Sequence, residues 1–76
     1  MNKIRRAQIQ KLIDKIDEVM FDLEDIQYDE ESARDSIPEN LQGSERYEKA
    51  EEACDNLASA MDYLEEVKGY LEESIV

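Results

Sequence analysis

The second half of the chain repeats itself every seven residues. Residues 53–59, 60–66 and 67–73 read Ala-Cys-Asp-Asn-Leu-Ala-Ser, Ala-Met-Asp-Tyr-Leu-Glu-Glu and Val-Lys-Gly-Tyr-Leu-Glu-Glu. A repeat of seven is typical of a coiled coil, because two helical turns return a side chain to the same side of the helix. It predicts one apolar seam, interrupted only by Lys68, that some other part of the chain must cover. The seam consists of Tyr47, Ala50, Cys54, Leu57, Met61, Leu64, Lys68, Leu71 and Ile75.

The first half of the chain predicts a helix of similar length, from about residue 2 to about residue 35. Asn2 is a favourable N-cap residue, and apolar residues again recur in alternating steps of three and four, with only Glu30 as an interruption. The predicted seam of this helix consists of Ile9, Leu12, Ile16, Val19, Leu23, Ile26, Glu30, Ala33 and Ile37.

A connector, residues 36–43, separates the two helices. Pro38 disfavours the helical conformation of Ile37, and Gly43 marks a second break. Ser44 is the expected N-cap of the second helix, over about residues 44–74. Two helices of similar length joined by a short connector predict an all-α fold, an antiparallel two-helix hairpin that is coiled-coil-like and forms a single domain over residues 1–76.

The two seams predict which residues face each other in this hairpin. Large apolar residues meet one another except at Leu12, which faces the aliphatic stem of Lys68. The expected pairs are Ile9 with Leu71, Ile16 with Leu64, Val19 with Met61, Leu23 with Leu57, Ile26 with Cys54 and Ala33 with Tyr47.

Further apolar side chains lie beside both seams and predict a second interface. A chain of 76 residues buries only about 60 to 65% of the surface that its unfolded state exposes, so additional burial would stabilise it. Aromatic residues that recur outside a seam are typical of protein contacts. The interface would serve either dimerisation into a four-helix bundle or docking on another protein; alternatively, the tyrosines lie flat on their own helix. The candidate face consists of Ile13, Met20, Phe21, Tyr28, Ala60, Tyr63, Val67 and Tyr70.

The charge of the chain is strongly acidic and limits the partners it can bind. There are 21 Asp and Glu residues against 9 Lys and Arg residues, which gives a net charge of -12. Direct binding to nucleic acid or to an anionic membrane is disfavoured, since both need clustered basic residues, and a basic surface on another protein is the natural complement. No stretch is long and apolar enough to span a bilayer, so we expect a cytoplasmic protein without membrane contact.

Carboxylates on the outer side of the first helix recur about every 5 or 6 Å, given the rise of a helix. This spacing is comparable with that of phosphates along a nucleic-acid strand, so a rigid acidic rod could occupy a nucleic-acid-binding groove. The alternative is that these acids only keep a small helical protein soluble. The candidate acidic face consists of Asp14, Asp17, Glu18, Asp22, Asp25 and Asp29.

Residues that carry enzyme chemistry are scarce. The chain has no His and a single Cys, which leaves no ordinary general base at neutral pH, no zinc cage and no Cys-His nucleophile. Cys54 lies on the predicted seam, where a free thiol behaves as a small buried hydrophobe. Calcium-loop spacing and a Gly-rich phosphate loop are also missing. We therefore expect a non-enzyme with no catalytic residues, no metal site and no cofactor.

The connector carries a resemblance to known proteins. It reads Ile37-Pro38-Glu39-Asn40-Leu41-Gln42-Gly43-Ser44-Glu45-Arg46, and together with the basic start and the Ala-x-Asp-x-Leu heptads it resembles small acidic helical proteins of phages and mobile elements of Gram-positive bacteria. That group has no characterised activity, so the resemblance implies a setting, the cytoplasm of a host cell. In such a setting two functions compete. One is an acidic inhibitor that covers a basic nucleic-acid-binding surface of a host defence protein, and the other is a homodimeric structural or assembly protein.

Overall fold

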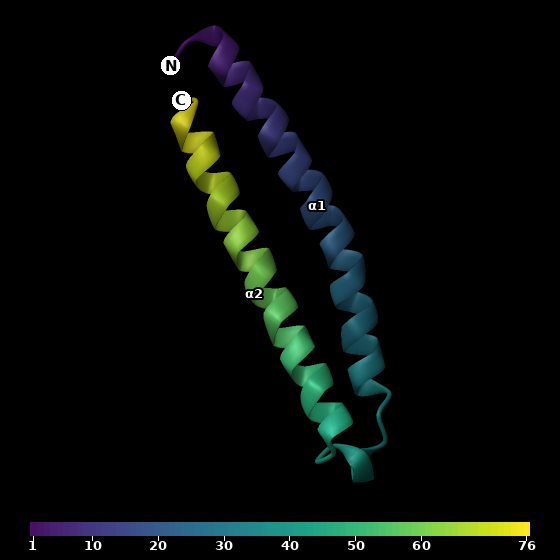
Figure 1. Cartoon of the computed structure of the whole chain (residues 1–76). Coiled ribbons are helices and arrows are strands. Elements are labelled where there is room, and N and C mark those ends of the chain that lie inside the picture. The colour runs from purple at the N-terminus through teal and green to yellow at the C-terminus, as the bar shows by residue number, and fades with distance from the viewer.

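The protein is a hairpin of two long helices. The computed structural model describes residues 1–76, in which α1 (Lys3–Asp35) and α2 (Glu45–Ser74) are joined by a connector that contains the short 3-10 helix η1 (Glu39–Leu41). The helices run side by side in opposite directions, and both termini lie at the same end of the molecule (Figure 1). The predicted antiparallel hairpin is thus confirmed.

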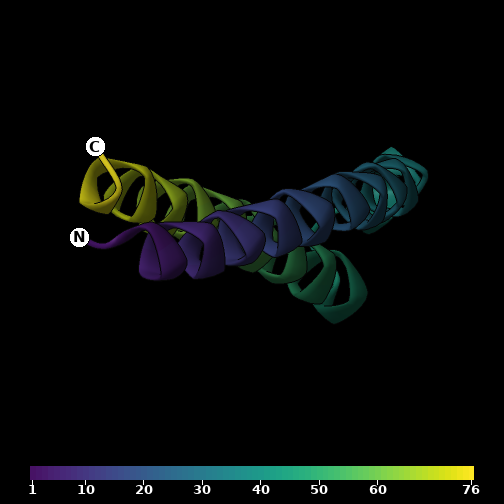
Figure 2. The same ribbon diagram turned by 90° about the horizontal axis from the view of Figure 1, so that it is seen from above.

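The molecule is an elongated rod. Its Cα atoms extend over 59 × 16 × 13 Å, and the view from above shows the two helices crossing at a shallow angle (Figure 2). Neither helix has a segment that is long and apolar enough to cross a membrane.

Both helices begin at the N-caps expected from the sequence. The side-chain oxygen of Asn2 accepts a hydrogen bond of 2.8 Å from the backbone N–H of Arg5, and the hydroxyl of Ser44 accepts one of 3.3 Å from the N–H of Tyr47. Each bond satisfies a backbone donor that the first helical turn leaves without a partner. Ile37, just before Pro38, is buried and closes the connector end of the hairpin.

The side chains that α2 turns toward α1 are those of its predicted seam. Every seam residue from Tyr47 to Ile75 is buried or half-buried, with Cys54 the most enclosed. Next to this seam only Ala53 is also half-buried. The heptad pattern therefore located the contact face of α2 correctly.

The predicted seam of α1 is half wrong. Ile13 is only 3% exposed, whereas its neighbour Leu12 is 48% exposed, and Val19 and Ile26 are 52% and 54% exposed. The helix is turned about its axis relative to the prediction. The expected row Leu12, Val19, Ile26 and Ala33 is exposed, and its place between the helices is taken by the row Ile13, Met20, Gln27 and Arg34. The residues of α1 that approach α2 are Ile9, Ile13, Ile16, Met20, Leu23, Gln27, Glu30 and Arg34.

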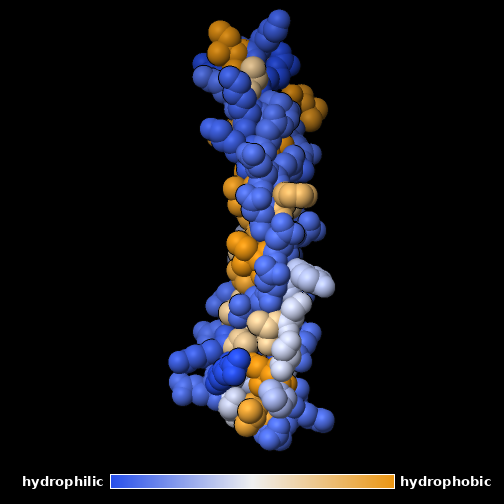
Figure 3. Space-filling view, turned by 90° about the vertical axis from the view of Figure 1, so that its right-hand side faces the viewer, coloured by the Kyte–Doolittle hydropathy of each residue, from blue (hydrophilic) through white to orange (hydrophobic).

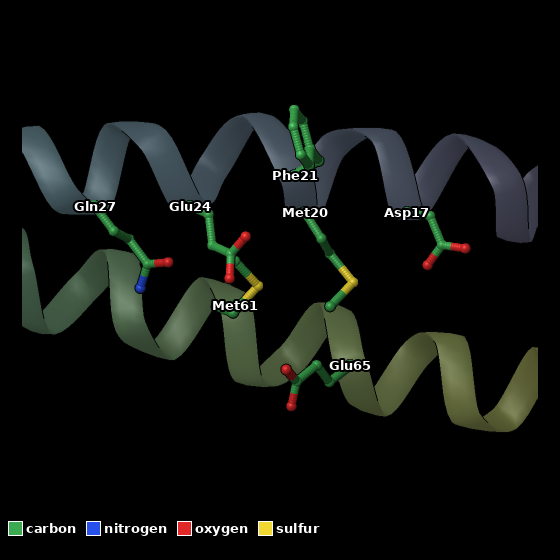
Figure 4. Close-up of a pocket in the computed structure, with 7 residues that line it drawn as sticks. All are labelled: Asp17, Met20, Phe21, Glu24, Gln27, Met61 and Glu65. Atoms are coloured by element: carbon green, nitrogen blue, oxygen red, sulfur yellow. The ribbon is translucent and has the colours of Figure 1, made fainter.

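This turn of α1 changes several of the expected pairs. Met20, and not Val19, lies beside Met61 between the helices (Figure 4). The ammonium group of Lys68 forms an ion pair with Asp17 instead of leaving its stem over Leu12. Lys68 is the one charged residue in the seam of α2, and the turn of α1 toward its Met20 row brings Asp17 within reach of it.

Candidate protein-interaction surfaces

The row of α1 that the hairpin leaves uncovered is apolar along its length. Leu12, Val19, Ile26 and Ala33 follow one another in steps of seven, and each is exposed. The buried residues of α1 also recur in steps of seven, so this row keeps a constant position beside the seam. It forms an apolar stripe on one side of the rod.

Two rows of α2 lie on that same side. A shallow groove at the connector end is lined by Glu30, Ala33 and Ile37 of α1 and by Arg46, Lys49 and Ala50 of α2. Ala33 belongs to the exposed apolar row of α1. Steps of seven along α2 lead from Arg46 to Ala53, Ala60 and Val67, and from Lys49 to Asn56, Tyr63 and Tyr70. These two rows of α2 therefore adjoin the stripe of α1.

The two rows of α2 contain no acidic residue, although the rest of that helix is rich in them. All acids of α2 occupy other positions, namely Glu45, Glu48, Glu51, Glu52, Asp55, Asp62, Glu65, Glu66, Glu72 and Glu73. In a chain with a net charge of -12, a continuous acid-free surface is an unusual feature. We call this surface the apolar face, made of Leu12, Val19, Ile26, Ala60, Tyr63, Val67 and Tyr70.

Some of the exposed hydrophobic side chains form a row. Seen from the α1 side, the rod is mainly hydrophilic; hydrophobic side chains come to the surface along one edge over its middle, and others lie toward both ends (Figure 3). Large exposed apolar patches are characteristic of surfaces that bind other proteins.

The other side of the hairpin carries a shallow groove of about 290 Å³. Met20 and Met61 lie between the helices at its floor, and Phe21 points outward from α1, away from α2 (Figure 4). The remaining lining residues are Asp17, Glu24, Gln27 and Glu65. With three carboxylates at its rim, this groove is far more acidic than the apolar face.

The predicted partner face is divided by the structure into three parts. Ile13 is buried and Met20 half-buried between the helices, so the hairpin itself uses them and they are not available to a partner. Phe21 and Tyr28 are exposed on the outer side of α1. The others lie together on the apolar face: Ala60, Tyr63, Val67 and Tyr70.

The contribution of α1 to the apolar face was not predicted, since the heptad pattern assigned Leu12, Val19 and Ile26 to the hairpin seam. A signal for this surface did exist in α2, where the rows of Ala60 and Val67 and of Tyr63 and Tyr70 contain no acid. Such an absence indicates a binding surface, because charged residues are depleted at the centre of protein interfaces.

The candidate acidic residues are all exposed: Asp14, Asp17, Glu18, Asp22, Asp25 and Asp29. Two of them have partners within the chain. Asp14 accepts a hydrogen bond of 3.1 Å from Gln10, and Asp17 pairs with Lys68, whose ammonium also lies 3.8 Å from Glu72. The hydrogen bond to Asp17, opposed by burial and supported by the charges of Asp17 and Glu72, raises the pKa of Lys68.

The single thiol is enclosed by the hairpin. Cys54 is buried and free, and burial is the main cause of the raised pKa of its thiol, with Arg34 acting in the opposite direction. No group of three or more Cys, Asp and Glu side chains is placed to hold a metal ion.

Comparison of the chain with protein-family models, with curated proteins and with solved structures yields no match.

Proposed function

We propose that the protein is a non-enzymatic protein-interaction module and that it binds through its apolar face. The observation that carries this proposal is the exposed row Leu12, Val19 and Ile26, which stands beside acid-free rows of α2. These three large aliphatic side chains are left half in water. Covering them with a partner would stabilise the complex by about 25 cal/mol for each Å² of apolar surface removed from water. Contact with another protein surface would recover that free energy.

A photo-cross-linking experiment tests this proposal. The photoreactive residue benzoylphenylalanine is placed at Tyr63 in the apolar face, where it resembles the native aromatic ring, and the full chain is expressed in cells that carry its gene. The matched control has the same residue at Tyr28, an equally exposed tyrosine outside the face. We expect a covalent adduct with a protein from position 63 and little from position 28. Absence of any adduct from position 63 would contradict the proposal.

A second candidate function uses the acids that remain outside the apolar face. The chain would then act as an acidic inhibitor that covers a basic nucleic-acid-binding surface, in the phage or mobile-element setting implied by the resemblance. The observation in its favour is that Glu18, Asp22, Asp25 and Asp29 are exposed along α1 without an ion-pair partner in the chain. Carboxylates in such a line offer a basic surface a charge pattern like that of a nucleic-acid backbone.

This second function is tested by competition. The chain is titrated into a complex of a basic nucleic-acid-binding protein with its oligonucleotide, and release of the oligonucleotide is followed at two salt concentrations. Release should weaken at the higher salt concentration and in the triple variant Glu18→Gln, Asp22→Asn, Asp25→Asn. A triple variant that releases the oligonucleotide as well as the native chain does would exclude mimicry by this row.

A further inference from the structure

We propose that a second copy of the chain covers the apolar face, in an antiparallel arrangement that places the two connectors at opposite ends of a four-helix bundle. This inference rests on the proposed function, since it names the partner of the same face. In this dimer a two-fold axis passes close to Val19 and Tyr63.

The side of the rod that carries the apolar face is large enough for a stable dimer. The rod is 59 Å long and 16 Å wide, so this complete side, with the apolar face in its middle part, is of the order of the 800 Å² that each partner contributes to a typical stable interface. Its centre is made of aliphatic and aromatic side chains without acids, as the core of an interface requires. Two chains that each carry a charge of -12 could not approach closely through any side lined with carboxylates.

The rows of the face match themselves when one copy is reversed. Val19 lies at the middle of α1 (Lys3–Asp35), so an axis at that level superimposes the full lengths of the two α1 helices. Val19 then meets its own copy, and Leu12 lies level with Ile26 of the second copy. A surface that pairs with itself about a two-fold axis is the commonest basis of homodimers.

The same axis also aligns the rows of α2. The ion pair between Asp17 and Lys68 and the groove that Met20 and Met61 line together place Tyr63 at about the level of Val19. Val67 then lies level with Ala60 of the second copy, so a large side chain faces a small one. Such alternation of large and small residues lets facing layers interdigitate.

The charges along α1 are complementary in the antiparallel dimer. The helix begins with Lys3, Arg5 and Arg6, whereas the half that follows Lys15 is acidic. Reversal of one copy brings each basic end to the acidic connector half of the other, where opposite charges attract. It also places Lys15 level with Asp22 of the second copy.

The first measurement is the mass of the full chain in solution. We expect twice the monomer mass by analytical ultracentrifugation, and a monomer at micromolar concentration would overturn the proposal. Val19→Asp sets two carboxylates against each other at the axis and should raise the dissociation constant about 100-fold or more. The matched control Phe21→Asp, at an exposed position outside the face, should leave the dimer intact. Helical circular dichroism verifies that both variants fold.

A second pair of variants covers the case in which Val19→Asp fails to fold. Ala60→Glu introduces an acid into an acid-free row of α2, whereas Ser59→Glu adds the same charge one position away, outside the face. We expect dissociation by Ala60→Glu only. Equal effects of Ala60→Glu and Ser59→Glu would overturn the assignment of the interface to this face.

Disulfide trapping then tests the orientation. In a Cys54→Ala background, Val19→Cys should form a disulfide with its own copy, and a mixture of the Leu12→Cys and Ile26→Cys chains should form the mixed disulfide. A dimer in which neither disulfide forms would overturn the antiparallel axis. The outcome remains separable from that of the proposed function: a monomer whose position 63 is cross-linked to a different protein supports the function and refutes self-association.

Discussion

The two helices carry apolar patterns of similar quality, yet only α2 packs as its pattern predicts. On one side of the α2 seam lies the row Glu51, Ala58, Glu65 and Glu72, whose carboxylates would have to leave water if the helix turned in that direction. The corresponding row of α1 contains Ile13, Met20, Gln27 and Arg34 and no acid. Nothing in that row of α1 opposes burial.

This difference shows what fixes the rotation of a helix within a hairpin. Apolar residues allow burial, but acids exclude it, so the acidic row on one flank of the α2 seam stops that helix from turning in that direction. Helix α1 has no such acidic row on the flank that carries Ile13 and Met20, and a single partner helix covers only two of its three neighbouring rows that can be buried. The third row, with Leu12, Val19 and Ile26, stays exposed.

The largest expected effect comes from breaking the seam of α1 at its most enclosed residue. Ile13→Ala should lower the free energy of unfolding by about 2 to 5 kcal/mol, because it leaves a cavity between the helices. The matched change Leu12→Ala removes a side chain that is 48% exposed and should cost about 1 kcal/mol or less in the isolated hairpin.

Urea unfolding at two protein concentrations checks this pair of variants. The cost of Ile13→Ala should not depend on concentration, whereas that of Leu12→Ala should grow with it if the second copy covers Leu12. A larger cost for Leu12→Ala than for Ile13→Ala in dilute solution would show that α1 is turned as its sequence pattern suggested.

A smaller effect should come from completing the row that α1 buries. Gln27 is a half-buried polar residue between Met20 and Arg34 in that row and lines the groove beside Met61. Gln27→Leu should raise the melting temperature and stabilise the hairpin by about 1 kcal/mol, because a leucine gains apolar contact there. Gln10→Leu, at an exposed position of the same helix, serves as the control and should change little. No gain from Gln27→Leu would argue against the observed contact face.

The smallest effect concerns the ion pair between Asp17 of α1 and Lys68 of α2. The pKa of Lys68 is raised in the folded chain, chiefly by its hydrogen bond to Asp17. A raised pKa means that the folded state holds its proton more tightly, so this contribution to stability is complete at neutral pH and is lost as the pH rises through the alkaline range in which Lys68 deprotonates. Burial raises the pKa of Cys54 and acts in the same direction, so the measurement uses a Cys54→Ala background.

Unfolding free energies measured from neutral to alkaline pH should decline less steeply in Asp17→Asn than in its parent. The variant Asp14→Asn, which changes a carboxylate without a cross-helix partner, is the matched control and should retain the parental slope. Identical slopes in all three chains would mean that the pair between Lys68 and Asp17 does not couple the helices in solution.

Local signals in the sequence were enough to predict the hairpin. The seven-residue repeat, the caps Asn2 and Ser44 and the break at Pro38 are such signals, since local hydrogen bonding and backbone conformation are enough to place helix ends. The acids along one flank of the α2 seam also excluded that flank from burial. These features could be predicted because each depends on residues that are close in the chain.

The rotation of α1, and with it the identity of the exposed apolar row, depends on tertiary contacts. Ile13 and Leu12 are adjacent and equally apolar, so no local signal favours the burial of one over the other. The choice depends on contacts with residues of α2 that lie far away in sequence, among them Met61, beside which Met20 lies, and Lys68, which pairs with Asp17. The apolar face follows from those distant contacts, which is why it could not be located from the pattern of α1 alone.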